Sequence, residues 1–373
     1  MHKRMEQAGC GFSMRFTMLN SHDIARDVIS RIRDGNRQMR GSSIPHGAWH
    51  PAECILLAVA ADRGYEVCVF LFPALTGNRL ARRLLCMKRT DIEMTSYLKS
   101  FLSFDLGHLD EHECPERTTE IAYVPGLKAD LYVPKDGKSV HPLIIVIFGG
   151  GWVSGFRRDR FVQPMLKPVR LGYAVAVPDY TLALDAAFPQ ALLDIKRCIQ
   201  YFRRHAEEYG IDPARIALWG ESAGGHLALE AGLVGQDELS VGGDDQVQSV
   251  IALYPLTDPL SESNQAAALQ FEEDSCGSDS VFSIFMGDGF HDERMMRLAS
   301  PVCHLNDSMP RIILQHGTAD RMVPYLQSTE FMDRAREMGL EDRVTLELAE
   351  GKGHTDPWFF TDENVAHLME KIG

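Results

Sequence analysis

Residues 215–233 read RIALWGESAGGHLALEAGL and join a strand pattern, a tight turn and a helix pattern without a break. The apolar run Arg215–Trp219 is typical of a strand buried on both faces of a sheet, and Gly224–Gly235 predicts the helix that follows it. A sharp strand-to-helix turn needs small neighbours, because its central residue takes strained backbone angles. We therefore expect Ser222 to be a nucleophile raised above the sheet; the alternative is a tight turn with a bystander serine.

Strand patterns alternate with helix patterns from about residue 116 onward. This alternation predicts an α/β protein with a doubly wound, mostly parallel, eight-stranded sheet. In such sheets, sites form beyond the carboxyl ends of the strands. The expected strands are Thr119–Val124, Ala129–Val133, His141–Phe148, Tyr173–Val177, Arg215–Trp219, Val247–Tyr254, Arg311–His316 and Arg343–Ala349, and the main expected helices are Gln190–Tyr209, Gly224–Gly235, Tyr325–Gly339 and Glu363–Ile372.

Two further strand ends carry the partners that a serine nucleophile needs. A serine hydroxyl requires a base to take its proton and a third group to orient that base. Asp320 follows the strand Arg311–His316, and His354 follows the next strand along the chain. The order Ser222, Asp320, His354 is that of the α/β-hydrolase fold. We expect these three residues to form a catalytic triad.

Other residues near the same strand ends are weaker candidates for a catalytic or binding role. Asp258, after the strand Val247–Tyr254, is the alternative acid. We interpret His226 and His316 as structural residues. Arg157, Arg158 and Arg160 could meet an acidic substrate, but a solvated basic turn is the favoured reading.

The glycine run Phe148-Gly149-Gly150-Gly151-Trp152 ends a central strand pattern. Consecutive glycines let backbone N–H groups approach a ligand without obstruction by side chains. We expect Gly150 and Gly151, together with Ala223, to donate to an oxyanion. A merely flexible connection is the alternative.

Composition excludes several classes of protein. The 373 residues include 38 Lys and Arg against 52 Asp and Glu, a formal net charge of −14, which disfavours phosphate backbones and anionic lipid. The eight cysteines contain no CxxC pair, so a zinc site or redox dithiol is unsupported. We expect no cofactor, no metal, no nucleic-acid or membrane partner, and a cytoplasmic location; a removed export signal is the alternative. The oligomeric state stays open, a homo-oligomer included.

The negative charge is not uniform along the chain. Residues 1–115 carry 15 basic and 13 acidic side chains, whereas the remainder is strongly acidic. We expect a mainly helical extension over 1–115, acting as a lid, an interface or an accessory module, with helices at Ser21–Asp34, at Pro51–Ala61 and from Thr90 to about Phe104; Tyr65–Phe72 could be a strand. The catalytic domain is expected over 116–373, with a cap-like insertion at about 260–300.

Residues 118–373 resemble the α/β-hydrolase esterases of the hormone-sensitive-lipase type, above all the bifunctional feruloyl and acetyl-xylan esterases. The resemblance implies the triad and oxyanion residues named above, and implies that Asp179 and Tyr180 buttress the oxyanion loop. It rests on FGGGW at 148–152, DYTLALDAAFPQALLD at 179–194, GIDPARIALWGESAGGHLAL at 210–229, ASP at 299–301, HGTADRMVPYLQS at 316–328 and GKGH at 351–354.

The sequence departs from the family pattern at three places. Phe148 stands where the oxyanion motif usually begins with His, Thr181 replaces the usual Arg, and Trp358 lies in an aromatic run after His354. Trp152, Glu221 and Trp358 are the candidate residues of the substrate pocket.

Taken together, these features predict a metal-independent serine esterase that acts on short-chain acyl esters. The resemblance implies acetyl or feruloyl groups on plant polysaccharide, so the expected partner is a small-molecule or saccharide ester. An amidase, formamidase or peptidase could use the same triad. A non-catalytic binding protein on a hydrolase fold, and a partner-binding role for residues 1–115, are the alternatives outside this chemistry.

Overall fold

The protein was analysed as a computed structural model, which describes residues 54–58, 69–73, 106–235, 238–271, 275–278 and 280–372. The chain divides into two compact units, Met1–Lys88 and Arg89–Gly373. In the first unit, β1 (Cys54–Ala58) and β2 (Val69–Pro73) form an antiparallel pair.

The helix predicted over Pro51–Ala61 is wrong, because Cys54–Ala58 is a strand. This apolar run forms its backbone hydrogen bonds with a second apolar run, Val69–Pro73, rather than within a helix. The second run overlaps Tyr65–Phe72, where a strand was considered. The helices predicted over Ser21–Asp34 and from Thr90 to about Phe104 lie outside the described residues.

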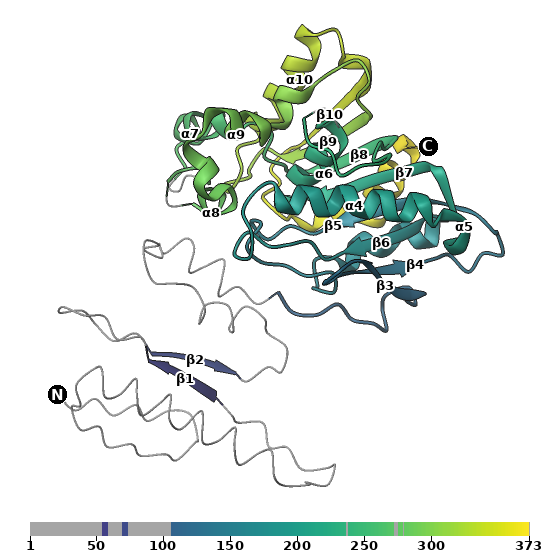
Figure 1. The fold of residues 1–373 in the computed structure, drawn as a ribbon. Helices are drawn as coiled ribbons and strands as arrows, with labels where there is room; N and C mark the ends of the chain where they lie inside the picture. Colours follow the sequence, from purple (N-terminus) through teal and green to yellow (C-terminus); the bar gives the residue numbers. More distant parts are fainter. Residues whose placement is uncertain are drawn as a thin grey trace, which may run out of the picture. The chain divides into compact units, whose positions relative to one another are not determined.

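The second unit is built around an eight-stranded sheet (Figure 1). Its strand order is β10-β9-β8-β7-β5-β6-β4-β3, with parallel pairing from β10 to β6 and antiparallel pairing of β4 with β6 and β3. The predicted doubly wound, mostly parallel sheet is confirmed. The strands are β3 (Thr119–Val124), β4 (Leu127–Tyr132), β5 (His141–Ile147), β6 (Ala174–Pro178), β7 (Ile211–Glu221), β8 (Ser249–Leu253), β9 (Arg311–Gly317) and β10 (Val344–Ala349).

The central strands are rich in apolar residues, and this composition places them in the buried middle of the sheet. Every residue of β6 and of β8 is buried, as expected for apolar runs covered on both faces. β7 begins at Ile211 rather than at the predicted Arg215, because Ile211 pairs with His141 of β5 across a register shift.

Helices pack on the sheet and on one another. α4 and α6 lie side by side against β7 (Figure 1). η1 contacts β6, α11 contacts β9, and these two helices also contact each other. No helix within the described ranges is both long and apolar enough to cross a membrane. The helices of this unit are η1 (Gln163–Leu171), α4 (Gln190–Arg204), α5 (Ala206–Tyr209), α6 (Ala223–Leu233), α7 (Pro259–Ala268), α8 (Val281–Met286), η2 (Gly287–His291), α9 (Glu293–Leu298), η3 (Pro301–His304), α10 (Leu326–Glu337), η4 (Glu341–Arg343), η5 (Pro357–Phe360) and α11 (Asp362–Ile372).

The segment expected to form a cap is helical. α7, α8 and α9 follow β8 in the chain and gather together beside the sheet (Figure 1). Asp258 begins α7 as its N-cap, and Asp292 begins α9 in the same way. We use the term cap for residues 259–298.

Where β7 turns into α6, the backbone packs against itself and against the end of β5 so closely that two positions have no room for a Cβ atom. A Cβ atom on Gly224 would lie 2.1 Å from the carbonyl oxygen of Ile147 and 2.5 Å from that of Phe148, both at the end of β5. A Cβ atom on Gly220 would lie 2.0 Å from the carbonyl oxygen of Gly224. Real Cβ atoms do not approach backbone this closely, so both positions require glycine.

We predict that Gly224→Ala lowers the free energy of unfolding by about 3 kcal/mol or more, because the backbone of β5 has to move. Urea unfolding followed by circular dichroism measures this change. Gly235→Ala is the control: its Cβ meets no atom within 4 Å, and we expect a change within about 0.5 kcal/mol. Equal unfolding midpoints for the two variants would contradict the tight crossing.

Candidate active site

Ser222 stands at the turn between β7 and α6 with φ 53° and ψ −123°. Few L-residues adopt positive φ, and strain of this kind is typical of a nucleophile held at a strand-to-helix turn. The Ser222 N–H donates to the Leu253 carbonyl at 2.9 Å, which ties the turn to the end of β8. The neighbouring glycines keep the turn closed, and the hydroxyl stands above the carboxyl edge of the sheet.

The structure brings the three predicted triad residues together. His354 Nε2 lies 2.9 Å from Ser222 Oγ, and His354 Nδ1 lies 2.7 Å from Asp320 Oδ2. An ionised carboxylate only accepts, so Nδ1 carries the proton and Nε2 is free to accept from the serine hydroxyl. These contacts have the geometry that proton transfer from a serine to an imidazole needs.

The charges of the triad depend on burial and on each other. Asp320 is buried, and burial alone would raise the pKa of its carboxyl; the nearby imidazoles of His354 and His316 lower the pKa instead. Burial likewise lowers the pKa of His354, but the Asp320 carboxylate and, more weakly, Glu221 raise it above its ordinary value. The site therefore favours the imidazolium that appears once the serine proton is transferred.

The acid loop is held by several local bonds. Asp320 Oδ1 accepts from the N–H groups of Met322 and Val323 at 2.8 and 3.0 Å. His316 Nε2 lies 3.1 Å from the Val323 carbonyl oxygen and 3.3 Å from Asp320 Oδ2. His316 thus packs against the acid, as a structural residue would. Asp258, the alternative acid, caps α7 through Leu260 N instead.

The predicted oxyanion loop, which follows β5, contains three successive residues in the left-handed region. Gly150, Gly151 and Trp152 have φ values of 96°, 58° and 61°. The Gly150 carbonyl accepts from Val153 N at 3.3 Å and from Ser154 N at 3.0 Å, which closes the turn. Ala223 is the first residue of α6, where the N–H has no partner within the helix.

Tyr180, which lies just after β6, supports this loop. Its hydroxyl lies 3.0 Å from the Phe148 carbonyl oxygen and 3.2 Å from that of Gly149. The Phe148 ring stacks on the Tyr180 ring with centroids 4.4 Å apart. Phe148 therefore replaces the expected His by packing rather than by hydrogen bonding. Thr181, in place of Arg, donates its N–H to Asp194 Oδ2 at 3.1 Å.

A small cavity opens beside Ser222, with a volume of about 20 Å³. Trp152 lines it, as predicted for a pocket residue, and so do Gly151 and Ala223. Among the described residues, Glu221 and Trp358 are not part of the lining. The lining residues are Gly151, Trp152, Ser222, Ala223, Leu256, Ser275, Val281, Met322 and Val323.

The BD-FAE family matches residues 129–334, more than half of the chain and all of the segment that runs from β4 to the acid loop. The chain belongs to the BD-FAE family. The resemblance to α/β-hydrolase esterases stated from the motifs is confirmed by this match.

Relatives of this BD-FAE chain carry esterase names. Esterase LipC of Mycobacterium tuberculosis is 30% identical over 220 residues, covering 57% of this chain and 52% of LipC. Among solved structures, the native Est2 esterase of Thermogutta terrifontis is 26% identical with a TM-score of 0.53, covering 71% of this chain and 92% of Est2. A truncated carbohydrate esterase from gut microbiota has a TM-score of 0.62 at 23% identity, covering 71% of this chain and 98% of its own, and shows the fold alone. The chain spans about half the length of the curated relatives it matches.

Trp152 joins the oxyanion loop of the BD-FAE chain to the cap. Its ring stacks on Phe285 with centroids 4.8 Å apart, and Phe282 lies 5.6 Å away. Its indole N–H donates to His226 Nδ1 at 3.3 Å, and His226 Nε2 lies 3.0 Å from the Ala299 carbonyl oxygen. Burial lowers the pKa of His226 to about 4, so this histidine is neutral and structural, as predicted.

The arginines after the oxyanion loop have carboxylate partners. Arg157 forms ion pairs with Glu120, Asp130 and Asp179, and Arg158 pairs with Glu120 and Asp130. The solvated basic turn favoured from the sequence is therefore wrong for these two residues. Their charges are used inside the fold, where they brace the loop that carries the oxyanion glycines.

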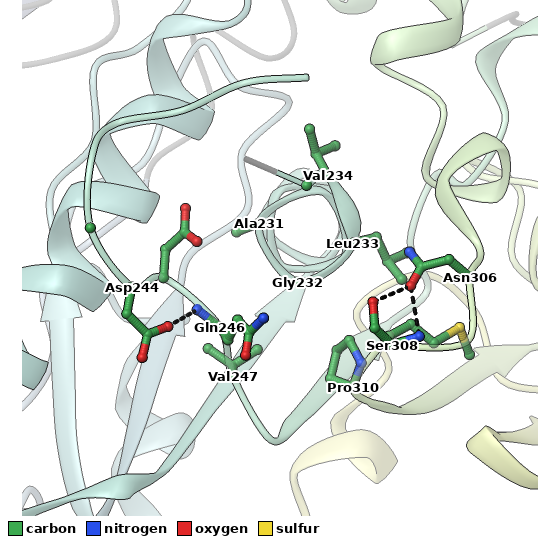
Figure 2. Close-up of a pocket in the computed structure, with 14 residues that line it drawn as sticks. Ala231, Gly232, Leu233, Val234, Asp244, Gln246, Val247, Asn306, Ser308 and Pro310 are labelled. Carbon is green, nitrogen blue, oxygen red and sulfur yellow. Dashed lines mark hydrogen bonds between the residues drawn. The ribbon is translucent and has the colours of Figure 1, made fainter. Parts of the chain in front are cut away.

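A larger cavity of about 660 Å³ lies at the other end of α6 (Figure 2). It borders Ala231–Val234 and the chain that enters β8 and β9, with Asp244, Asn306 and Ser308 around it. None of the triad residues lines it. Within the part of the chain that the structure describes, no group of three or more His, Cys, Asp or Glu side chains could hold a metal ion.

Sequence reasoning missed most of the lining of the small cavity. Leu256, Met322 and Val323 follow the carboxyl ends of β8 and β9, so the strand-end rule that located the triad could have found them. Ser275 and Val281 belong to the cap, and no sequence signal places them beside Ser222.

We predict that Asp320→Asn slows phosphonylation of Ser222 by about 10³–10⁴-fold, because the imidazolium loses its counter-charge. His354 must be neutral to accept the serine proton, so the rate in the wild-type protein falls as pH drops through its raised pKa. Without the carboxylate, burial dominates and lowers that pKa, so the acid limb moves to lower pH. Inactivation rates with a fluorophosphonate from pH 5 to 9 measure both effects; an unshifted acid limb would contradict the assignment.

Proposed function

We propose that this chain hydrolyses carboxylic esters through an acyl-enzyme on Ser222. The contacts Ser222–His354 at 2.9 Å and His354–Asp320 at 2.7 Å carry this proposal. His354 takes the hydroxyl proton as Ser222 Oγ bonds to the ester carbon, and it returns that proton to the departing alcohol. A water molecule then reverses the sequence: His354 takes a proton from the water as the water oxygen bonds to the acyl carbon. The bond from that carbon to Ser222 Oγ breaks, His354 returns the proton to Oγ, and the carboxylic acid leaves.

The oxyanion formed in both steps needs donors that are already in place. We assign this task to the backbone N–H groups of Gly150, Gly151 and Ala223. Gly151 and Ala223 support the assignment by lining the cavity at Ser222, and Gly150 directly precedes Gly151 in the same left-handed turn. No side chain projects from the two glycines, so the backbone can approach the substrate closely.

The acyl group is proposed to be short. A cavity of about 20 Å³ holds about one water-sized group, which suits the methyl of an acetate. Leu256, Val281 and Val323 give it apolar walls. The Est2 esterase of Thermogutta terrifontis, 25% identical to this chain, has been solved with propionate and with butyrate bound.

The alcohol of the substrate is proposed to be a sugar or another small hydroxylated molecule. This proposal rests on the resemblance to feruloyl and acetyl-xylan esterases together with the BD-FAE family match. A panel of acetylated and feruloylated xylo-oligosaccharides, with p-nitrophenyl acetate and a formyl amide for comparison, separates the acyl classes and distinguishes an esterase from an amidase. Turnover of the amide alone would favour an amidase.

We predict that the wild-type protein hydrolyses p-nitrophenyl acetate and that Ser222→Ala reduces this hydrolysis to the solution background, a loss of at least about 10⁴-fold in kcat. Ser308→Ala is the control, because Ser308 lines the larger cavity and lies away from the triad. A folded wild-type protein that turns over no ester of the panel would refute the proposed function. Equal losses in both variants would move the site to the larger cavity.

We predict that Leu256→Ala raises kcat/KM for butyryl relative to acetyl esters by about tenfold, because each methylene accommodated in an apolar pocket is worth about 1–3 kcal/mol. Leu305→Ala is the control: Leu305 is also buried but does not line the cavity, so the ratio should stay at its wild-type value. A ratio unchanged in Leu256→Ala would show that the acyl chain binds elsewhere.

A further inference from the structure

Glu221 contacts the oxyanion loop and acts electrostatically on His354. Only 6% of its surface is exposed, and its Oε1 accepts the Gly149 N–H at 2.7 Å. The contact is close enough that a Cβ atom on Gly149 would lie 2.2 Å from the same oxygen. The carboxylate was expected to line the substrate pocket; it lies instead behind the loop, where it holds the first glycine of the run.

The groups that face Glu221 come from four neighbouring segments. His354 follows β10, Tyr254 follows β8, Tyr180 follows β6, and Asp159 follows the oxyanion loop. His354 is the only one of these that carries positive charge when protonated. The Tyr254 ring lies against the imidazole, with centroids 4.6 Å apart.

These surroundings act on the carboxyl in opposite directions. Burial is the stronger influence and raises the pKa of Glu221 above its ordinary value, although the charge of His354, the Gly149 N–H and the nearby Tyr254 act to lower it. Glu221 in turn raises the pKa of His354. An isolated buried carboxylate is costly, so a buried one that keeps its charge needs a donor and a cation, and both are present here.

We propose that Glu221 is an ionised positioning residue with two tasks in the ester hydrolysis proposed above, on which this inference rests. It anchors the oxyanion loop through the Gly149 N–H, and its charge stabilises the imidazolium of His354. No proton passes to Glu221. The proton of Ser222 moves to His354 Nε2, and the positive charge that results is stabilised by two carboxylates, Asp320 and Glu221.

The two tasks are linked by geometry. Gly149 immediately precedes Gly150 and Gly151, so fixing its N–H also fixes where the next two N–H groups lie. Displacement of donors by a few tenths of an ångström weakens transition-state stabilisation more than ground-state binding, since the oxyanion exists only in the transition state and intermediates. Loss of the anchor should therefore lower kcat rather than raise KM.

Two substitutions separate charge from anchoring. Glu221→Gln keeps an oxygen for the Gly149 N–H but removes the charge; we expect the acid limb of kcat/KM to move to lower pH and the plateau to fall about tenfold. Glu221→Ala removes both, and we expect kcat to fall by about 10²–10³-fold with little change in KM. Ester hydrolysis from pH 5 to 9, with thermal unfolding to confirm the fold, measures these effects.

Asp159→Asn is the matched control. Burial raises the pKa of Asp159 to about 7, so this carboxyl titrates in the same pH range. Asp159 accepts from the N–H groups of Phe156, Phe161 and Val162 and not from Gly149. We expect Asp159→Asn to leave the acid limb at its wild-type pH.

A second measurement needs no turnover. The imidazole signals of His354, assigned by difference from His354→Ala, can be titrated by NMR in the wild-type protein and in Glu221→Gln; we expect the pKa of His354 to be lower in the variant. An unchanged pKa of His354, together with a wild-type pH profile, would overturn the proposal while Ser222-dependent hydrolysis stands. If no ester is hydrolysed, the NMR titration alone decides.

Discussion

The contact between the start of α6 and the end of β5 constrains the whole site. Gly224 lies so close to the carbonyl oxygens of Ile147 and Phe148 that neither chain can move without the other. Since Ser222 lies two residues before this contact and the oxyanion loop begins at Phe148, one backbone crossing sets the position of Ser222 relative to the glycines proposed as oxyanion donors. A rigid crossing of this kind supplies preorganisation before any substrate is present.

Electrostatics at the site follow from the same enclosure. Burial alone would favour a neutral imidazole, yet the Asp320 carboxylate and, more weakly, Glu221 raise the pKa of His354. Charges are also balanced behind the oxyanion loop, where Arg157 and Arg158 meet three carboxylates. The carboxyl groups near His354 favour the positive charge that this residue carries for part of the reaction. The ion pairs of Arg157 and Arg158 are permanent, and they stabilise the loop without taking part in proton transfer.

The sequence predicts local and strand-end features well and long-range packing poorly. Glycines flanking Ser222, apolar runs and the order of strand ends are enough to place Ser222, Asp320 and His354 at one edge of a parallel sheet. The orientation of the Glu221 side chain depends on the approach of Gly149, which comes from another strand, and no pattern in either segment signals that approach.

The partners of Arg157 lie up to 37 residues away, on β3, β4 and the loop after β6, so the sequence did not reveal its ion pairs either. Cys54–Ala58 was predicted as a helix because an apolar run of this length fits both periods, and only its pairing with β2 decides.

The cap and the oxyanion loop are not independent parts. Trp152 is the residue after Gly151, and it both lines the cavity and stacks on Phe285 of α8. The Phe285 carbonyl oxygen also accepts from Phe188 N at 2.6 Å, which fixes α8 to the segment that precedes α4. A change of the cap that displaces α8 therefore moves Trp152, and with it the neighbouring oxyanion glycine. Under the proposed ester hydrolysis, acyl selection and oxyanion stabilisation both depend on this tryptophan, so variation in the cap that preserves activity has to preserve the position of this ring.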